Sequence, residues 1–324
     1  GGRISSTGST SITMNGCMGT DKPLISILMA VYEPRVDWLR EQLMSLNDQT
    51  YPNLRLYIRD DCSPTVPYEQ IQSCVQECIT SFPYTIARNE KNLGSNGTFE
   101  LLTQEADGEL FAYCDQDDVW LPEKLTVLQE AMEREQAVLS YSDVSVIDGK
   151  GIPLAKSLCD LRPRLVYWEG CGLAPRLFFR NCIAGCTMLV DSTSAKQAAP
   201  FPRYTVCDQW IALLAAEKGR VTLVPGQLVR YRQHKRNQTG VLAGVSDKQS
   251  YLNYKVVPLE ERLAFYRQHG KVEEEVEIFA TARLHGSLAK IWKYRDLAPY
   301  EARFEIALRL LPDFLIRQIL RRMK

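Results

Sequence analysis

The sequence predicts an α/β fold with a mostly parallel central sheet, and three observations support this prediction. From Leu24 onward, short apolar runs alternate with amphipathic segments. The apolar runs have the length of buried strands, and the amphipathic segments repeat their apolar residues at helical spacing. Strands that alternate with helices indicate βαβ units with right-handed crossovers. The chain has 324 residues, of which 45% are hydrophobic and 24% charged, which is typical of a globular protein of one large domain or two small ones.

The first half of the chain contains the regular part of this pattern. We expect strands at 24–32, 54–60, 84–89, 109–115 and 137–143, and helices at 35–47, 67–81, 95–106 and 122–134. The first helix places Val36, Leu39, Leu43 and Leu46 on one face. Ser95 or Asn96 is the expected N-cap of the third helix, and Pro122 begins the fourth.

The pattern becomes irregular after residue 143. We expect a hairpin at 146–154 around an Asp-Gly turn, a strand within 181–191, a helix at 206–219 that ends at Gly219, and a strand or strand pair at 220–234 with a turn at Pro225-Gly226. From about residue 247 the chain is expected to be helical, and its last two helices are separated by Pro312.

Composition excludes several classes of function. Lys plus Arg and Asp plus Glu are both 39, so the balanced charge gives no indication of a nucleic-acid partner. The ten cysteines contain no CxxC pair, which disfavours a zinc cluster, and we expect reduced, mostly buried thiols in a cytoplasmic protein. Residues 1–21 are expected to be a disordered leader or an expression remnant. The sequence has no run of about 18 apolar residues that would span a membrane.

Polar clusters follow the first four predicted strands. They are "YEP" at 32–34, "DDCSP" at 60–64, "NEKNLGSNGT" at 89–98 and "DQDD" at 115–118. Ligands of open parallel sheets bind beyond the carboxyl ends of the strands, so these clusters could line one site. The first three are also ordinary turn sequences. "DQDD" differs, because three carboxylates at a buried strand end repel one another unless a cation such as Mg²⁺ or Mn²⁺ neutralises them.

Seven segments taken together carry a family resemblance. They are "ISILMAVYEP", "RDDCSP", "NEKNLGSNGT", "CDQDDVWLPEKL", "NCIAGCTMLV", "CDQW" and "YRQHKRNQTG". In this order and spacing they resemble a family 2 glycosyltransferase of the GT-A fold, close to bacterial rhamnosyltransferase-like members. The resemblance covers about residues 22–242 and leaves 243–324 as a C-terminal helical extension.

The resemblance implies a nucleotide site and a metal site. The implied nucleotide-binding residues are Ala30, Tyr32, Glu33, Asp60, Asn92, Gly94 and Asp115. Asp117 and His234 are the implied metal ligands for Mg²⁺ or Mn²⁺, and Asp115 would hold the ribose or a metal-bound water. Asp118 would support this cluster.

The resemblance also implies a catalytic base and an acceptor site. Asp208 in "VCDQW" matches the base, although Cys207 stands where the family has a second acid, and the alternative is a helix-capping role for Asp208. We expect an apolar pocket near Trp210 to raise the pKa of Asp208. The implied diphosphate or acceptor contacts are Arg232, Lys235, Arg236, Trp120, Gly185 and Trp210.

The implied reaction is inverting transfer of a sugar from a nucleoside diphosphate to a hydroxyl of a saccharide or lipid-linked saccharide. dTDP-rhamnose is the favoured donor and UDP-sugars come next. The amphipathic C-terminal helix 311–324 would contact the inner membrane surface, a second subunit or the domain itself. The alternatives are a nucleotidyltransferase, which usually has a Gly-rich phosphate loop after its first strand, and a non-catalytic nucleotide-sugar binding protein.

Overall fold

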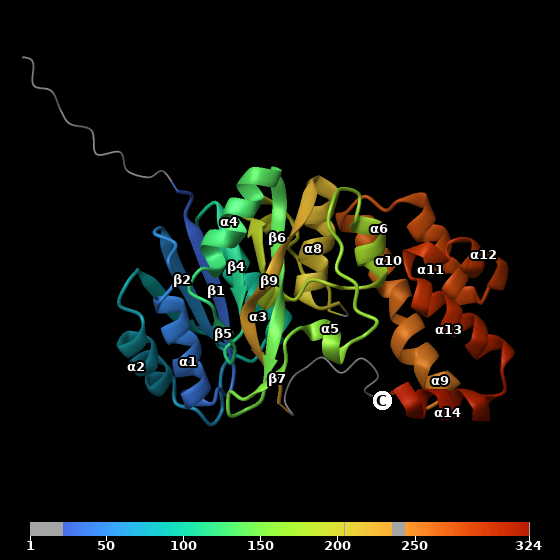
Figure 1. The fold of residues 1–324 in the computed structure, drawn as a ribbon, viewed down its shortest axis with the longest axis horizontal. Helices are drawn as coiled ribbons and strands as arrows, with labels where there is room; N and C mark the ends of the chain where they lie inside the picture. Colours follow the sequence, from blue (N-terminus) through green and yellow to red (C-terminus); the bar gives the residue numbers. More distant parts are fainter. Residues whose placement is uncertain (1–21, 204, 235–243, 324) are drawn as a thin grey trace, which may run out of the picture.

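A computed structural model describes residues 22–203, 205–234 and 244–323. The described residues contain a nine-stranded sheet in the order β3-β2-β1-β4-β8-β6-β9-β5, with β7 paired to β6 (Figure 1). The strands are β1 (Ile25–Val31), β2 (Leu54–Asp60), β3 (Tyr84–Arg88), β4 (Leu110–Cys114), β5 (Val119–Trp120), β6 (Ala137–Ile147), β7 (Pro153–Ala155), β8 (Met188–Asp191) and β9 (Arg220–Arg232).

Helices cover both faces of the sheet. The helices are α1 (Val36–Asn47), α2 (Tyr68–Cys78), α3 (Gly94–Glu105), α4 (Lys124–Glu135), α5 (Leu158–Leu161), α6 (Ala174–Phe179), α7 (Ser192–Gln197), α8 (Cys207–Lys218), α9 (Lys248–Tyr251), α10 (Pro258–His269), α11 (Glu274–His285), α12 (Leu288–Lys293), α13 (Pro299–Leu310) and α14 (Asp313–Met323). Side chains alternate across β1, so Ile27 packs with α1, α2 and α4, whereas Leu28 packs with α3 and α8 on the other face. The α/β class is therefore confirmed.

Most strands of the sheet run in one direction. β3, β2, β1 and β4 run parallel, with Val31 opposite Asp60 and Asp60 opposite Arg88. β8 runs antiparallel to both β4 and β6 and separates them, so β6 has the direction of β4, and β9 pairs with β6 in parallel. The expectation of a mostly parallel sheet is confirmed, and β5, β7 and β8 are its antiparallel strands. The antiparallel direction of β8 brings its N-terminal end beside the carboxyl end of β4.

Several local predictions need correction. Helix α3 begins at Gly94 with Leu93 as a cap that makes no side-chain bond, so neither Ser95 nor Asn96 is the N-cap. Of the two alternatives for 220–234, the single strand is found at Arg220–Arg232, and Pro225 and Gly226 lie where its register against Ser142 and Asp143 shifts. Gly219 ends α8 as predicted, but its backbone is extended, and a Cβ there would approach Val138 to 2.8 Å.

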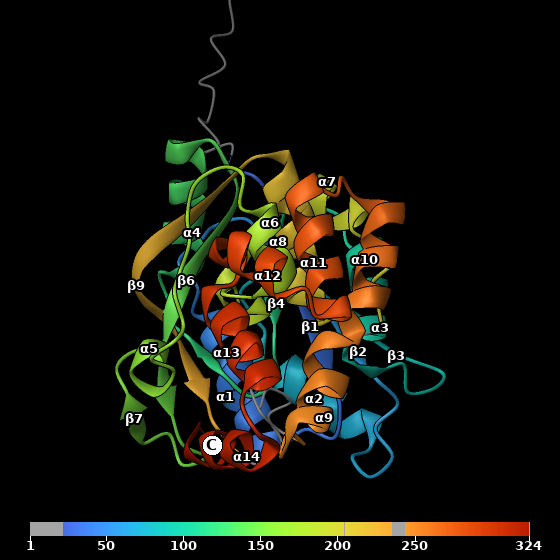
Figure 2. The ribbon, with the colours of Figure 1, turned by 90° about the vertical axis from the view of Figure 1, so that its right-hand side faces the viewer.

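The C-terminal helices continue the core on the α8 side of the sheet (Figure 2). The Trp210 ring of α8 packs on Phe265 of α10, and Phe179 of α6 packs on Phe279 of α11. A smaller cluster joins Ile316 and Leu320 of α14 to Tyr251 and Leu308. One face of α14 therefore packs on the protein itself. Among the described residues, no helix combines the length and apolar character needed to cross a membrane.

Candidate active site

The carboxyl ends of β1 and β4 are joined by Gln116. Its side-chain oxygen accepts a hydrogen bond from the Tyr32 N–H at 2.8 Å, and its side-chain nitrogen donates to the Tyr32 carbonyl at 3.0 Å. This pair of bonds fixes the "DQDD" turn against the end of β1. The Tyr32 side chain stays 45% exposed and is free to meet a ligand. Sequence reasoning missed Gln116, because it was counted only as the spacer between acidic residues.

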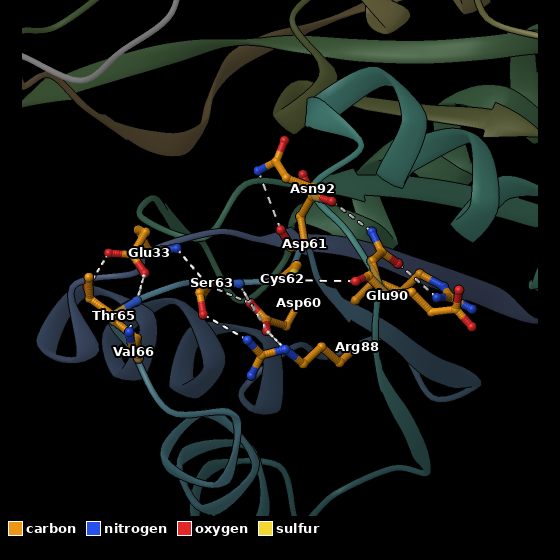
Figure 3. Close-up of polar contacts among 12 residues, drawn as sticks. Glu33, Asp60, Asp61, Cys62, Ser63, Thr65, Val66, Arg88, Glu90 and Asn92 are labelled. Atoms are coloured by element: carbon orange, nitrogen blue, oxygen red, sulfur yellow. Dashed lines mark hydrogen bonds and ion pairs between the residues drawn. The ribbon is translucent and has the colours of Figure 1, made fainter.

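Glu33 ties the end of β1 to the loop after β2. Its carboxylate accepts hydrogen bonds from the N–H groups of Thr65 at 2.7 Å and Val66 at 3.2 Å and from the Thr65 hydroxyl (Figure 3). Its own N–H donates to the Ser63 hydroxyl at 2.8 Å. Glu33 has a φ of 46°, which is uncommon outside glycine, and these contacts hold it there. Ala30 lies just before this turn, within the β1–β2 ladder.

The two acids after β2 have separate partners. Asp60 is fully buried, accepts a 2.5 Å hydrogen bond from the Ser63 hydroxyl, and lies 3.3 Å from Nε of Arg88. Asp61 accepts the N–H groups of Leu93 at 2.7 Å and Gly94 at 2.9 Å. Asp61 therefore accepts hydrogen bonds from backbone N–H groups at the start of α3, the role that we had expected of Ser95 or Asn96.

Asn92 and Gly94 meet the same loop. The side-chain nitrogen of Asn92 points at the Asp61 carbonyl at 3.4 Å, and its oxygen accepts the Gly94 N–H at 3.1 Å (Figure 3). Gly94 has a φ of 73°, and the absence of a side chain makes this backbone conformation accessible without strain. All four predicted polar clusters thus lie along one edge of the sheet, and each of them is bonded to a neighbouring cluster.

The "DQDD" turn brings three carboxylates together at the end of β4. Burial, and then the neighbouring Asp117 and Asp208, raise the pKa of Asp115 to about 7. Burial, Asp115 and Asp117 raise the pKa of Asp118 well above its usual range. Asp118 Oδ1 accepts the Arg232 N–H at 2.9 Å, whereas Oδ2 is buried without a hydrogen-bond partner. A cation bound at this turn would reduce the repulsion between carboxylates, which adds to burial in raising the pKa values of Asp115 and Asp118.

Two buried cations partly balance the turn. The Arg232 guanidinium is 1% exposed, donates to the Asp117 carbonyl at 2.8 Å, and pairs with Glu41. Lys124 is fully buried and its Nζ donates to the Cys186 carbonyl at 2.6 Å, 2.9 Å from the centroid of the Trp120 ring. Burial lowers the Lys124 pKa to about 7, while Asp118 and Asp115 act in the opposite direction. Sequence reasoning missed Lys124, which lies in the quoted "LPEKL" segment.

The structure places Arg232 and Trp120 beneath the turn. Arg232 holds the Asp117 backbone from inside the protein, and Trp120 is 1% exposed. Both side chains support the turn from its buried side, and their implied contact with a diphosphate or acceptor stays a prediction. Lys235 and Arg236 lie outside the described residues.

His234 lies beside Asp117. Its Nε2 is 2.7 Å from Asp117 Oδ2, and its ring is 4.9 Å from the Trp38 ring. A different trio, Asp115, Asp118 and Cys186, has its ligand atoms within 4.8 Å of one another. Oxygen and imidazole ligands suit Mg²⁺ or Mn²⁺, whereas burial raises the pKa of the Cys186 thiol well above its usual range and disfavours a thiolate ligand. Asp117 and His234, whose ligand atoms adjoin, offer oxygen and imidazole donors of the kind that these ions accept, whereas Asp115 lies with Asp118 and Cys186.

Asp208 lies in the first turn of α8, on the β8 side of the turn. Its carboxylate accepts the Gly185 N–H at 3.1 Å and the Asn181 side-chain amide at 3.1 Å. Burial raises its pKa to about 6 against these bonds. Asp208 contributes to the raised pKa of Asp115, after burial and Asp117, so the two carboxylates lie close enough to interact electrostatically. The N-cap of α8 is Val206, so Asp208 does not have the capping role.

Trp210 does not form a pocket around Asp208. Two residues along a helix is a turn of about 200°, so the two side chains point in different directions. The Trp210 N–H donates to the Ala198 carbonyl at 2.7 Å, and the ring is fully buried against α10. The pKa of Asp208 is raised as expected, but through general burial beside Gly185.

Comparison with known proteins agrees with this geometry. Residues 26–186 match the model of the family described as "Glycosyl transferase family 2". The chain is 27% identical over 177 residues to Bacillus subtilis TuaG, whose name assigns it to teichuronic acid biosynthesis, covering 54% of this chain and 65% of TuaG. It is 30% identical over 171 residues to Escherichia coli WcaA, named for colanic acid biosynthesis, covering 51% of this chain and 56% of WcaA.

The fold has solved counterparts. Residues 1–349 of Staphylococcus aureus TarS superimpose with a TM-score of 0.55 at 13% identity, covering 88% of this chain and 87% of that structure. The complex of the same piece with UDP-GlcNAc gives a TM-score of 0.53 at 16% identity. The chain spans less than two thirds of the curated relatives it matches, at 65% of TuaG and 56% of WcaA. The matched segment contains every strand-end cluster described above, and on this basis the chain belongs to the family 2 glycosyltransferases.

Proposed function

We propose that the protein transfers a sugar from a nucleoside diphosphate to a hydroxyl group of a saccharide or lipid-linked saccharide in bacterial surface polysaccharide synthesis. The observation that carries the proposal is the meeting of Asp208 with the "DQDD" turn. A buried carboxylate with a pKa of about 6 faces an acidic turn at the ligand-binding edge of the sheet. The relatives named for teichuronic and colanic acid synthesis support the polysaccharide context.

The strand-end residues would hold the donor. Tyr32 offers an exposed ring, and the Glu33, Asp60, Asn92 and Gly94 network fixes the loops on which a nucleoside would lie. Because the network is internally bonded, the site is formed before the nucleotide binds, which lowers the ordering cost of binding.

Asp208 would be the base. A carboxylate with a pKa of about 6 is ionised at neutral pH and is a stronger base than an ordinary aspartate. The hydrogen bonds from Gly185 and Asn181 orient the Asp208 carboxylate. A side chain at position 185 would touch Asp208, because its Cβ would lie 3.5 Å from Asp208 Cβ. Deprotonation of an acceptor hydroxyl would allow its oxygen to attack the anomeric carbon opposite the diphosphate, which inverts configuration in one displacement.

Asp117 and His234 would hold Mg²⁺ or Mn²⁺, and Asp115 would hold the ribose or a metal-bound water. When bound, such an ion supplies positive charge to the departing diphosphate. The protein contributes the acidic turn, which Gln116 and Arg232 fix in place from either side.

The donor is proposed as dTDP-rhamnose, with UDP-sugars next. The rhamnosyltransferase-like motifs favour the first, and the TarS complexes with UDP-GlcNAc and UDP favour the second. A thermal-shift series with dTDP, UDP and GDP, each with Mn²⁺, tests the proposal. We expect dTDP or UDP to raise the melting temperature most. Preference for GDP would overturn the donor assignment, and no stabilisation by any of the three would contradict the enzyme itself.

Membrane contact is proposed through the outer face of α14. Phe314 is 62% exposed, Leu310 at the end of α13 is 66% exposed, and Arg317, Arg321 and Arg322 are exposed nearby. Exposed apolar side chains beside arginines suit an anionic lipid surface, where a lipid-linked acceptor would also lie. Sedimentation with vesicles that contain phosphatidylglycerol tests this contact, and equal binding to neutral vesicles would contradict it.

A further inference from the structure

A cavity of about 290 Å³ lies between helix α10 and the segment that precedes α8. Its lining consists of aromatic and proline side chains with three charged groups, namely Phe201, Pro202, Arg203, Thr205, Glu261, Arg262 and Phe265. None of these residues belongs to the strand-end clusters or to the "DQDD" turn. A mostly apolar wall with a few polar groups is typical of a small-molecule site, although this volume is at the small end.

Arg262 presents an incompletely used guanidinium to this cavity. Its Nε donates to the Thr205 hydroxyl at 3.0 Å, and one terminal nitrogen donates to the Phe178 carbonyl at 2.9 Å. The other terminal nitrogen has no hydrogen bond to the described residues, and it is not among their buried unpaired atoms, so it remains accessible. Two of the guanidinium nitrogens are thus anchored, which leaves the third oriented for a ligand.

The charge around Arg262 is not balanced by a carboxylate. No acidic side chain in the described part of the chain forms an ion pair with it, and burial together with Arg283 lowers its pKa to about 10. Lys255 lies close enough that Arg262 helps to lower its pKa, after burial.

The remaining charges at the cavity do not change this conclusion. Arg203 is exposed and has no ion pair with a described residue, and Glu261 is the acid in the lining. Glu301 acts to raise the pKa of Lys255, and its carboxylate also lies 4.0 Å from the Arg180 guanidinium. A half-buried guanidinium without a counter-ion has lost part of its hydration, and an incoming anion would offset that loss.

The cavity is rigidly connected to the proposed base. The Asn96 side-chain nitrogen donates to the carbonyls of Pro202 at 2.8 Å and Thr205 at 2.7 Å, and its oxygen accepts the Cys207 N–H at 3.0 Å. One side chain therefore fixes both the cavity wall and the start of the helix that carries Asp208. A group bound in the cavity would be held in a fixed relation to that helix.

We infer that this cavity binds an acid-bearing sugar unit of the acceptor, through a carboxylate or a phosphate on Arg262 and Arg203 and a ring face on Phe201 and Phe265. The inference rests on the proposed function and adds that the acceptor is anionic. Arginine pairs with both kinds of oxyanion through two parallel hydrogen bonds, and an aromatic wall suits the apolar face of a sugar ring. Glu261 disfavours a second negative charge on the same unit.

Titration of the full chain with three matched sugars tests the inference. Glucuronate, glucose 6-phosphate and glucose share a ring and differ in charge, and their binding is followed by ligand-observed NMR with EDTA present to keep phosphate from a metal site. We expect glucuronate or glucose 6-phosphate to bind about tenfold more tightly than glucose. The tighter of the two anions identifies the acid group.

Variants locate the binding. Arg203→Gln and Arg262→Gln should each weaken anion binding about tenfold. Arg134→Gln is the matched control, because that side chain is 66% exposed on α4 and should have no effect. Arg262 also anchors Thr205 and Phe178, so its variant could lose stability, whereas the exposed Arg203 gives a test that does not depend on folding.

Three outcomes would overturn the inference: no anion binding, glucose binding as tightly as the anions, or anion binding that Arg203→Gln leaves unchanged. UDP or dTDP binding with Mn²⁺, measured on wild-type protein without EDTA, separates this result from the proposed function. If a nucleotide binds and the anionic sugars do not, only the acceptor site is wrong. If no nucleotide binds, the donor site and the proposed function fail.

Discussion

At the scale of single residues, the pKa of Asp208 links its surroundings to its proposed role. Its carboxylate is oriented by Gly185 and Asn181, and burial outweighs these bonds. Asp208→Asn keeps the size and the accepting oxygen but removes the base. We expect a loss of about 10²–10⁴-fold in kcat, the range that general-base catalysis contributes, with little change in the affinity for nucleoside diphosphate.

The measurement is sugar transfer, together with nucleotide affinity by calorimetry. Asp48→Asn is a matched control, since Asp48 is exposed beyond the end of α1. Unimpaired transfer by Asp208→Asn would remove Asp208 as the base. Lost nucleotide binding would instead show that Asp208 belongs to the donor site.

The same pKa predicts a pH profile. The ionised form of Asp208 is the active base, so kcat/KM should be constant well above pH 6 and fall about tenfold per unit below it. Saturating Mn²⁺ should hold Asp115 ionised, which removes its pKa of about 7 from the profile. A profile of kcat/KM from pH 5 to pH 8 tests this, and the absence of a decline towards pH 5 would contradict it.

At the scale of elements, Asp61 connects the end of β2 to the start of α3. Its carboxylate accepts the N–H groups of Leu93 and Gly94 and the side chain of Asn89 at 2.8 Å, and it is 3% exposed. Asp61→Ala would leave these donors unpaired, which costs about 1–3 kcal/mol for each group that stays buried. We therefore expect the free energy of unfolding to fall by about 2–4 kcal/mol, measured by urea denaturation.

A surface acid provides the comparison. Asp107 accepts hydrogen bonds from Arg55 and Tyr57, and its side chain is 54% exposed. Asp107→Ala should cost about 1 kcal/mol or less, because exposed ion pairs contribute little. Equal destabilisation by both substitutions would show that Asp61 is not a special connection between β2 and α3.

At the scale of the whole molecule, the C-terminal helices belong to the main core. The rings of Trp210 and Phe178 pack on Tyr266 of α10. The ring of Phe179 packs on Phe279 of α11. The boundary proposed at residue 242 therefore separates two sequence patterns, and it does not separate two cores. We expect a chain that ends at residue 242 to expose these aromatic side chains and to be insoluble or molten, as judged by soluble yield and near-ultraviolet circular dichroism. A soluble truncated chain with native-like spectra would contradict this view.

The sequence alone predicted the mostly parallel sheet and the polar clusters at the ends of its first four strands. Alternating apolar runs located β1 to β4, and the polar clusters that follow them lie along one edge because neighbouring parallel strands end on the same side. The chemistry of the "DQDD" turn could also be predicted, because three adjacent carboxylates imply a counter-charge. This prediction of a counter-charge depends on the residue types alone and does not need the order of the strands.

Only the tertiary structure showed what surrounds the turn. β8 inserts antiparallel beside β4 and carries Gly185 towards Asp208, while β9 brings Arg232 and His234 to the turn from 115 and 117 residues away. The sequence also did not show that Lys124 is buried, with its Nζ donating to the carbonyl of Cys186 just before β8. Periodicity reports which face of an element is buried but not which strand lies next to it. Strand order depends on packing between distant segments, and for this reason the sequence determined the carboxylates of the site, and the assembled sheet determined the cations and the base that face them.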